Sequence, residues 1–295
     1  MGLDVSAIAD SLAAGNAWQV SSAFAFAADA ELKSIACTLA RRVEESGGAA
    51  STVVDLVDLD LPATSLDLRD TLCRREALQF VAAHLAIVSV GEDWDEFLPA
   101  VRLLAESRSH RVHEALVLLV ARMASASFKS SRAFWAECLL EDSPHLPGLV
   151  LRGLALSDAP PLLVLELFST VISDLRKVIR HNLGPRAIPD LARRDPRAVY
   201  ARLKEWADMP DEITRWNVAH ALQTPLAGLY VESAMDIIDG LAADERPSIW
   251  RAAAEALVNV AQRRPAFVLP TLARWRTDPR RSKAAQLALT TLARR

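Results

Sequence analysis

The chain has 295 residues, of which 51% are apolar, so it can bury a substantial core and is not intrinsically disordered. Its three cysteines, Cys37, Cys73 and Cys138, lie far apart without a CxxC pair, which excludes a disulfide framework and predicts buried thiols in a reducing cytoplasm. The net charge of −3 is uneven, because residues 1–150 carry −9 and residues 151–295 carry +6.

The basic second half favours an anionic partner. Of its 22 basic residues, 19 are Arg, the side chain best suited to bidentate recognition of phosphate or carboxylate. The alternative is a general preference for Arg, since the whole chain has only five Lys.

Residues 1–62 are predicted to form an N-terminal helical cap with an irregular linker. The linker signal is a Ser/Gly/Ala-rich stretch at residues 46–52, followed by an acidic run at 55–60 and Pro62. The longest apolar run, residues 77–90, is interrupted by Gln79 and His84. Because it is too short to span a bilayer, we expect no membrane partner.

Residues 63–295 are predicted to form an array of HEAT-like helix pairs, an all-α, right-handed α-solenoid. First helices are expected at residues 94–106, 131–141, 160–170, 196–207, 229–242 and 265–277. Second helices are expected at residues 111–124, 146–157, 174–191, 213–223, 248–262 and 281–293. Gly184 and Pro185 fall inside one expected second helix, where we predict a break or kink.

A recurrence at an offset of 69 residues indicates the period of the array. The equivalent pairs are Ala192 and Ala261, Val199 and Val268, Leu203 and Leu272, and Trp206 and Trp275. This offset is about two units of 35 residues, a period typical of stacked helical repeats. Trp206 and Trp275, near the ends of first helices, are predicted to pack between repeats.

The turns between paired helices resemble those of HEAT repeats. Such repeats carry an Asp in the turn and an Arg about six positions later, which link neighbouring units. The corresponding pairs here are Asp174 and Arg180, Asp208 and Arg215, and Asp244 and Arg251. We predict turn-fixing ion pairs, in preference to any catalytic role.

Alignment of the second helices at a 35-residue offset predicts a binding surface. His181, Trp216 and Arg251 fall in one row, flanked by Arg180, Arg215 and Trp250. A row that mixes Arg with aromatic rings suits a nucleic-acid backbone or a flexible peptide. The predicted nucleic-acid-binding residues are Lys177, Arg180, His181, Arg215, Trp216, His220 and Arg251. The alternative is that the Trp side chains pack between repeats and the Arg side chains join turns.

Two segments carry a more specific resemblance: Lys-Val-Ile-Arg-His-Asn-Leu at residues 177–183 and Thr-Arg-Trp-Asn-Val-Ala-His-Ala-Leu at residues 214–222. Together with residues 191–206, they resemble the bacterial DNA-alkylation-repair family of alkylpurine DNA glycosylases, over about residues 174–293. The resemblance implies a basic concave surface that grips the DNA backbone without extruding the damaged base.

The catalytic residue of that family is not identified in this chain. One branch of the family carries its catalytic Asp in a Trp-Asp-x-Val-Asp motif. The nearest match here is Trp94-Asp95-Glu96-Phe97-Leu98, in which Leu98 replaces the final Asp. We therefore leave the catalytic residue unassigned.

No cofactor or metal is expected. Glycines are scattered without forming a phosphate-binding loop, and His110, His113 and Glu114 have no further ligand nearby in the sequence. We predict a non-catalytic, cytoplasmic binding module whose partner is nucleic acid, DNA in particular. The alternatives are a protein–protein scaffold and, if the chain is an enzyme, an alkylpurine DNA N-glycosylase.

Overall fold

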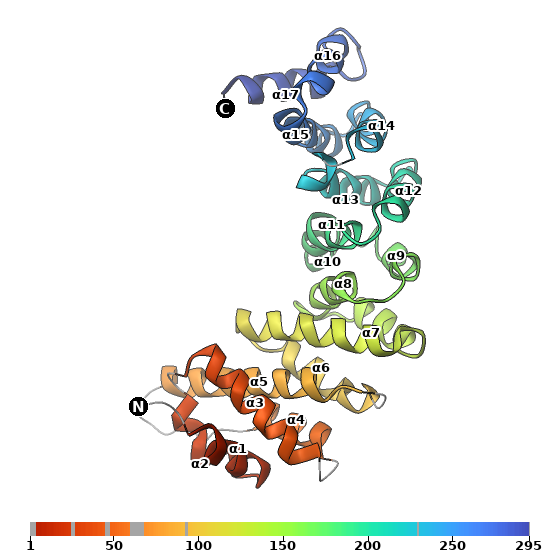
Figure 1. Cartoon of the computed structure of the whole chain (residues 1–295). Coiled ribbons are helices and arrows are strands. Elements are labelled where there is room, and N and C mark those ends of the chain that lie inside the picture. Colours follow the sequence, from red (N-terminus) through yellow and green to blue (C-terminus); the bar gives the residue numbers. More distant parts are fainter. Residues whose placement is uncertain are drawn as a thin grey trace. The chain divides into compact units, whose positions relative to one another are not determined.

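The chain is helical in the computed structural model, which describes residues 4–24, 27–44, 48–59, 68–91, 94–228 and 230–294 (Figure 1). No strand occurs within these ranges. The chain divides into two compact units, Met1–Gly153 and Leu154–Arg295. In each unit, helices pack on those before and after them in the sequence, which confirms the predicted all-α solenoid of helix pairs.

The first unit contains seven complete α-helices among its described residues. They are α1 (Val5–Ala13), α2 (Ala17–Val20), α3 (Asp29–Glu44), α4 (Ala49–Val57), α5 (Leu68–Ser89), α6 (Leu98–Ala105) and α7 (His110–Leu140). Short 3₁₀ helices cover Ser21–Phe24 and Trp94–Phe97. Helix α8 (Leu146–Leu156) begins in this unit and ends in the second.

Helix α4 corrects the prediction of an irregular linker over residues 49–57; residues 46 and 47 lie outside the described ranges. Val53, Leu56 and Val57 are buried, and their spacing of three and four positions places them on one helical face. Burial of this apolar face outweighs the weak helix propensity of the surrounding Ser, Gly and Thr. Asp60 and Pro62 lie outside the described residues.

Helix α7 joins two helices that the sequence predicts separately, at residues 111–124 and 131–141. The join is kinked at Ser127, whose φ of −156° and ψ of 60° are not helical. The hydroxyl of Ser131 donates a hydrogen bond to the Ser127 carbonyl at 2.8 Å and accepts one from the Trp135 indole N–H at 2.8 Å. The predicted boundary is therefore present as a kink.

In the second unit, helices alternate between two layers (Figure 1). The first-helix layer contains α9 (Pro161–Ser169), α12 (Pro196–Ala207), α14 (Val231–Ala242) and α16 (Pro265–Trp275). The second-helix layer contains α10 (Lys177–Asn182), α11 (Ile188–Ala192), α13 (Glu212–Leu222), α15 (Pro247–Arg263) and α17 (Ser282–Arg294). These bounds differ from the predicted ones by at most three residues.

Side-chain hydrogen bonds in the second unit repeat the period of the sequence. Arg194 donates to the carbonyl of Ala159, 35 residues earlier, and Arg246 donates to the carbonyl of Pro210, 36 residues earlier. Ser248 likewise donates to Glu212, 36 residues earlier. Polar contacts thus join each repeat to the one before it. Trp206 and Trp275 are both buried, as a packing role requires.

The predicted break at Gly184 and Pro185 is a π-helical segment, Leu183–Ala187, between α10 and α11. Pro185 lacks the N–H that would continue the α-helix. A Cβ atom on Gly184 would lie 2.6 Å from the backbone oxygen of Asn217 in α13. Glycine therefore allows the π-helical segment to approach the backbone of the next second helix.

Candidate functional site

Two side chains, one from α10 and one from α13, lie against the indole ring of Trp216 in α13. The guanidinium carbon of Arg180, in α10, lies 4.2 Å from the centroid of the Trp216 ring. The ring centroid of His220, one turn further along α13, lies 3.7 Å from that of Trp216. Both groups therefore contact the indole, and the imidazole plane is tilted by 40° from the indole plane. We call these three residues the Arg–Trp–His stack.

The stack gives Arg180 a fixed orientation. The face of an indole attracts a guanidinium through its quadrupole, and the planar cation matches the planar ring. A cation held in this way loses less side-chain entropy when an anion binds than a freely rotating surface Arg would lose. Trp216 in turn already contacts two side chains, so it is a support for Arg180 and not a free platform for a nucleobase.

His220 is neutral in this setting. Burial, the charge of Arg180 and the charge of His181 lower the pKa of His220 from 6.5 to about 4, and a hydrogen bond with Gln223 acts in the opposite direction. At neutral pH the imidazole therefore adds an aromatic surface to the stack without adding charge. The positive charge of the stack belongs to Arg180.

Arg180 has no carboxylate partner among the residues that the structure describes, and its buried Nε makes no hydrogen bond there. Other half-buried Arg side chains of the second unit are paired. Arg176 lies 2.7 Å from Asp174, Arg215 2.8 Å from Asp244, and Arg281 2.6 Å from Asp239. A half-buried cation without a counter-ion is costly unless an anion binds to it.

The repeat explains why Arg180 is unpaired. Arg180 and Arg215 are equivalent at the 35-residue offset, and Arg215 pairs with Asp244. The residue 35 positions before Asp244 is Met209, which is 42% exposed. At the turn position that would supply the counter-ion to Arg180, the chain thus has Met209, a thioether, and not a carboxylate.

The π-helical segment fixes the two helices that form the stack. The Asn182 amide donates to the Val178 carbonyl at 2.8 Å, and the Asn217 amide donates to the Ile172 carbonyl at 2.8 Å. Asn217 is fully buried beside Gly184, immediately after Trp216 in the chain. The contact that places Trp216 against Arg180 is therefore built into the core of the unit.

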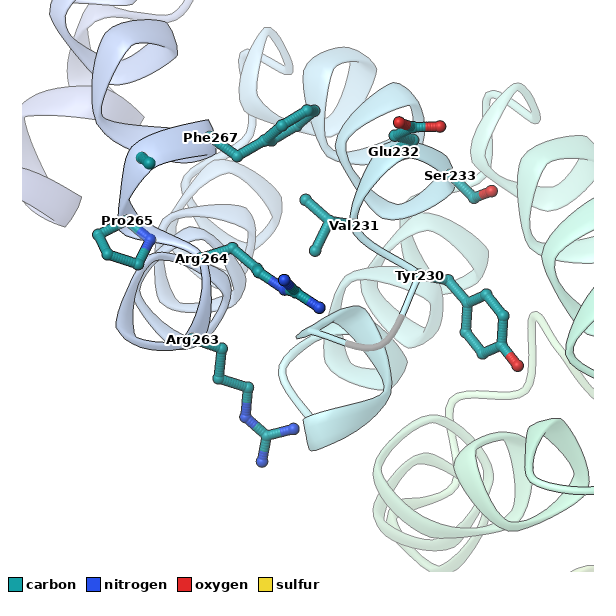
Figure 2. Close-up of a pocket in the computed structure, with 9 residues that line it drawn as sticks. Tyr230, Val231, Glu232, Ser233, Arg263, Arg264, Pro265 and Phe267 are labelled. Carbon is teal, nitrogen blue, oxygen red and sulfur yellow. The ribbon is translucent and has the colours of Figure 1, made fainter.

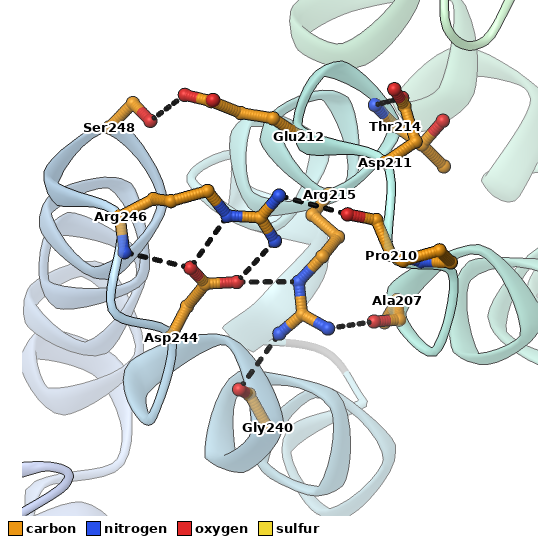
Figure 3. Close-up of polar contacts among 10 residues, drawn as sticks. All are labelled: Ala207, Pro210, Asp211, Glu212, Thr214, Arg215, Gly240, Asp244, Arg246 and Ser248. Atoms are coloured by element: carbon orange, nitrogen blue, oxygen red, sulfur yellow. Dashed lines mark hydrogen bonds and ion pairs between the residues drawn. The ribbon is translucent and has the colours of Figure 1, made fainter.

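Arg215 lies in a different environment, at the ends of α12 and α14 (Figure 3). It donates to the backbone oxygens of Ala207 at 2.7 Å and Gly240 at 3.0 Å, and its Nε lies 2.8 Å from Asp244. Asp244 also accepts hydrogen bonds from the side chain and the backbone N–H of Arg246. Although the sequence placed Arg215 in the binding row, the structure places it in this ion-pair network.

The turn ion pairs differ from those predicted by spacing. Asp174 pairs with Arg176 and not with Arg180, and Asp244 pairs with Arg246 and Arg215 and not with Arg251. Each Asp pairs with the Arg two residues later because its carboxylate also accepts the backbone N–H of that Arg, which brings the guanidinium within reach. The prediction of turn-fixing ion pairs is confirmed for Asp174 and Asp244, but with other Arg partners than predicted, and the predicted Asp208–Arg215 pair is wrong because Arg215 pairs with Asp244.

The remaining predicted residues lie apart from the stack or at its edge. Lys177 and His181 are exposed on α10, and the charge of His181 reaches His220. Arg251 is exposed on α15 and lies 5.2 Å from the ring centroid of its neighbour Trp250. Sequence reasoning did not identify Met209 or Gln223. Comparison of turn residues at the 35-residue offset contains the signal for Met209.

No group of three His, Cys, Asp or Glu side chains suited to a metal ion occurs among the described residues. His113 and His145 lie with ring centroids 4.7 Å apart, without a third such ligand within the described ranges. A bilayer-spanning helix is likewise not found in the described part of the chain.

No known protein family matches the sequence, and no curated protein matches it. Among solved structures, an engineered protein is similar at 17% identity, over 98% of this chain and 83% of its own, with a TM-score of 0.32. A designed armadillo repeat protein in complex with the peptide (KR)4 matches at 17% identity, over 81% of this chain and 98% of its own, with a TM-score of 0.30. These scores carry no information about ligand or activity, and nothing among the matches supports the DNA-alkylation-repair family specifically.

Proposed function

We propose that the chain is a non-catalytic binding module whose second-helix layer holds the phosphate backbone of a nucleic acid. The observation that carries the proposal is Arg180, a half-buried cation stacked on Trp216 without a carboxylate partner in the described part of the chain. Lys177 and His181 lie on the same helix, and Arg251 lies on a later second helix. Of these exposed side chains, Lys177 and Arg251 add positive charge to the second-helix layer.

A phosphate contact fits the stack better than base recognition does. Arg180 and His220 both lie against the Trp216 ring, so the indole is already engaged by two side chains and is a poor platform for a base. The guanidinium still offers a planar fork of donors, the geometry that matches a phosphate group. Binding by this route is independent of sequence and depends steeply on salt.

The overall charge of the second unit supports the same partner. Residues 154–295 contain 21 Lys or Arg and 16 Asp or Glu, a net charge of +5, whereas residues 1–153 carry −8. A positive unit raises the local concentration of polyanions and their association rate. The stack then provides one site in this field where the cation is already oriented.

The test is fluorescence anisotropy with a labelled 20-base-pair DNA duplex and the corresponding single strand, at several salt concentrations. Arg180→Ala is expected to weaken binding about tenfold and to reduce the salt slope by about one phosphate contact. Arg276→Ala is the matched control, because it removes the same charge from an exposed position outside the stack. Its effect is expected to be about twofold or less.

Two results would contradict the proposal. An equal loss of DNA affinity in the two variants would show that net charge, and not the stack, accounts for binding. Absence of binding at low salt would show that nucleic acid is not the partner. In the second case, a protein that co-purifies stably with the chain would favour the scaffold. Release of alkylated purine from damaged DNA would instead favour the glycosylase.

A further inference from the structure

The first-helix layer of the second unit contains a separate groove. One hollow, of about 790 Å³, lies where the starts of α14 and α16 face each other (Figure 2). A second, of about 650 Å³, lies between α12 and α14. Tyr230 and Ser233 line both hollows, so the two adjoin each other on either side of α14, and together we call them the groove. None of these helices carries the Arg–Trp–His stack.

Large apolar side chains are exposed along this groove. Tyr230 is 44% exposed and Phe267 is 46% exposed, and both line the first hollow. Tyr200 lines the second, with its ring centroid 5.6 Å from that of Tyr230. The Tyr200 hydroxyl donates to the Leu226 carbonyl at 3.3 Å, which fixes the inner wall. Aromatic side chains that are rigid and half-exposed are typical anchors of protein interfaces.

Cations outnumber carboxylates around these aromatic rings. Lys204 and Asp236 form an ion pair and cancel each other. Arg197, Arg263 and Arg264 remain, against the single carboxylate Glu232. Arg263 donates to the Pro225 carbonyl, and Figure 2 shows Arg264 extending toward the wall that carries Val231 and Tyr230. The groove therefore combines an apolar floor with a net positive rim.

We infer that this groove binds an extended acidic segment of another protein, which inserts two apolar side chains three positions apart. Packed helices lie about 8–10 Å apart, so hollows on either side of α14 are separated by a similar distance. An extended segment in the polyproline II conformation has three residues per turn and advances about 3.1 Å per residue, so side chains at positions i and i+3 project from one side about 9 Å apart and reach successive hollows. Acidic residues beside these anchors would meet Arg197, Arg263 and Arg264.

The probe is a fluorescein-labelled peptide, EELSSFEE, with its two apolar residues three positions apart. We measure its binding to the full chain by anisotropy, alongside KKLSSFKK, which reverses the charge, and EELFSSEE, which makes the apolar residues adjacent. The acidic peptide with spaced anchors is expected to bind at least tenfold more tightly than either control. Arg264→Glu is expected to weaken it about tenfold, whereas Arg274→Glu, at an exposed position of α16 outside the groove, leaves binding within about twofold.

Phe267→Ala and Leu269→Ala form a second matched pair, because both residues are about equally exposed, at 46% and 44%, and only Phe267 lines the hollow. Phe267→Ala is expected to weaken peptide binding about tenfold and to leave DNA binding unchanged, and Leu269→Ala is expected to change neither. Equal effects of the two substitutions, or equal binding of the acidic and basic peptides, would overturn the inference. Concentration-dependent dimerisation that Arg264→Glu abolishes would also overturn it, since the occupant would then be a second copy of the chain.

Discussion

The most direct test of the proposed site is to supply Arg180 with the counter-ion that its repeat lacks. Met209 occupies the position of Asp244, which pairs with Arg215, the equivalent of Arg180. Met209→Asp therefore places a carboxylate where the next repeat already uses one. The side chain at 209 is 42% exposed, so the substitution buries no new charge deeply and the fold is expected to persist.

The size of the effect follows from this exposure. The Arg215–Asp244 pair is largely buried, with side chains 16% and 6% exposed, whereas a pair at residue 209 would be nearer to solvent. We therefore assign the new pair ~1 kcal/mol, the upper end for exposed ion pairs. At that value about one molecule in six keeps Arg180 free, so the apparent Kd for nucleic acid rises about sixfold.

Anisotropy with the labelled duplex measures this change in Kd. Met209→Asn is the control, because Asn has nearly the same shape as Asp and carries no charge. In an Arg180→Ala background, Met209→Asp is expected to have little further effect on binding. Urea denaturation gives a readout that needs no partner, since the new ion pair is expected to raise the free energy of unfolding by up to ~1 kcal/mol. Equal effects of Asp and Asn at position 209, or an Asp effect that persists without Arg180, would refute the reasoning.

Three further predictions concern stability, measured by urea denaturation. Asp244→Ala leaves Arg215 without its counter-ion and is expected to lower the free energy of unfolding by ~2–4 kcal/mol. In the parent chain the same contribution is expected to be lost as the pH falls below the usual Asp pKa of 3.8, because the pKa of Asp244 is lowered in the folded state. Gly184→Ala is expected to cost ~1–3 kcal/mol because its Cβ meets backbone, whereas Gly240→Ala in α14, with nothing within 4 Å, is expected to stabilise by ~0.5–1 kcal/mol. The pKa of His220 is about 4 in the folded state and 6.5 in the unfolded state, so the unfolded state binds a proton more readily. The free energy of unfolding is therefore expected to be constant above pH 6.5 and to fall by ~2–3 kcal/mol toward pH 4. His220→Gln is expected to remove this loss.

Each of these has an outcome that would contradict it. An Asp244→Ala variant as stable as the parent would show that Arg215 needs only its two carbonyl acceptors. A shared sign for Gly184→Ala and Gly240→Ala would contradict the close approach to Asn217. An unchanged pH profile in His220→Gln would show that other groups, such as the similarly shifted His84, account for the loss.

Most of the fold was predictable because burial of a helical face leaves a periodic record. Pro196, with Asp195 as the N-cap, fixes the start of α12, and the apolar spacing of Val199, Leu203 and Trp206 fixes its buried face. At α4 the prediction was wrong, because it relied on the Ser and Gly content of the segment and not on the spacing of the buried residues Val53 and Leu56. Composition was a weaker guide than periodicity there, because packing overrides local propensity.

The candidate site was predictable only in part, for a different physical reason. The 35-residue offset brings Arg180 and Trp216 to neighbouring second helices, yet it pairs Trp216 with His181, whereas the side chain that crosses to the indole is that of Arg180. An offset fixes where the Cα atoms lie. It does not decide which of two adjacent side chains reaches across, since that depends on their length and on the partners that compete for them.

That competition separates two Arg residues that the repeat makes equivalent. Arg215 pairs with a carboxylate from the next turn, whereas the equivalent turn position for Arg180 is Met209, and the Arg180 guanidinium lies against the indole. One substitution in a turn thus converts a structural ion pair into an unpaired, oriented cation. In a repeat protein, where the same contact recurs along the chain, a site for a partner is therefore best sought where one repeat lacks the counter-ion that its equivalent retains.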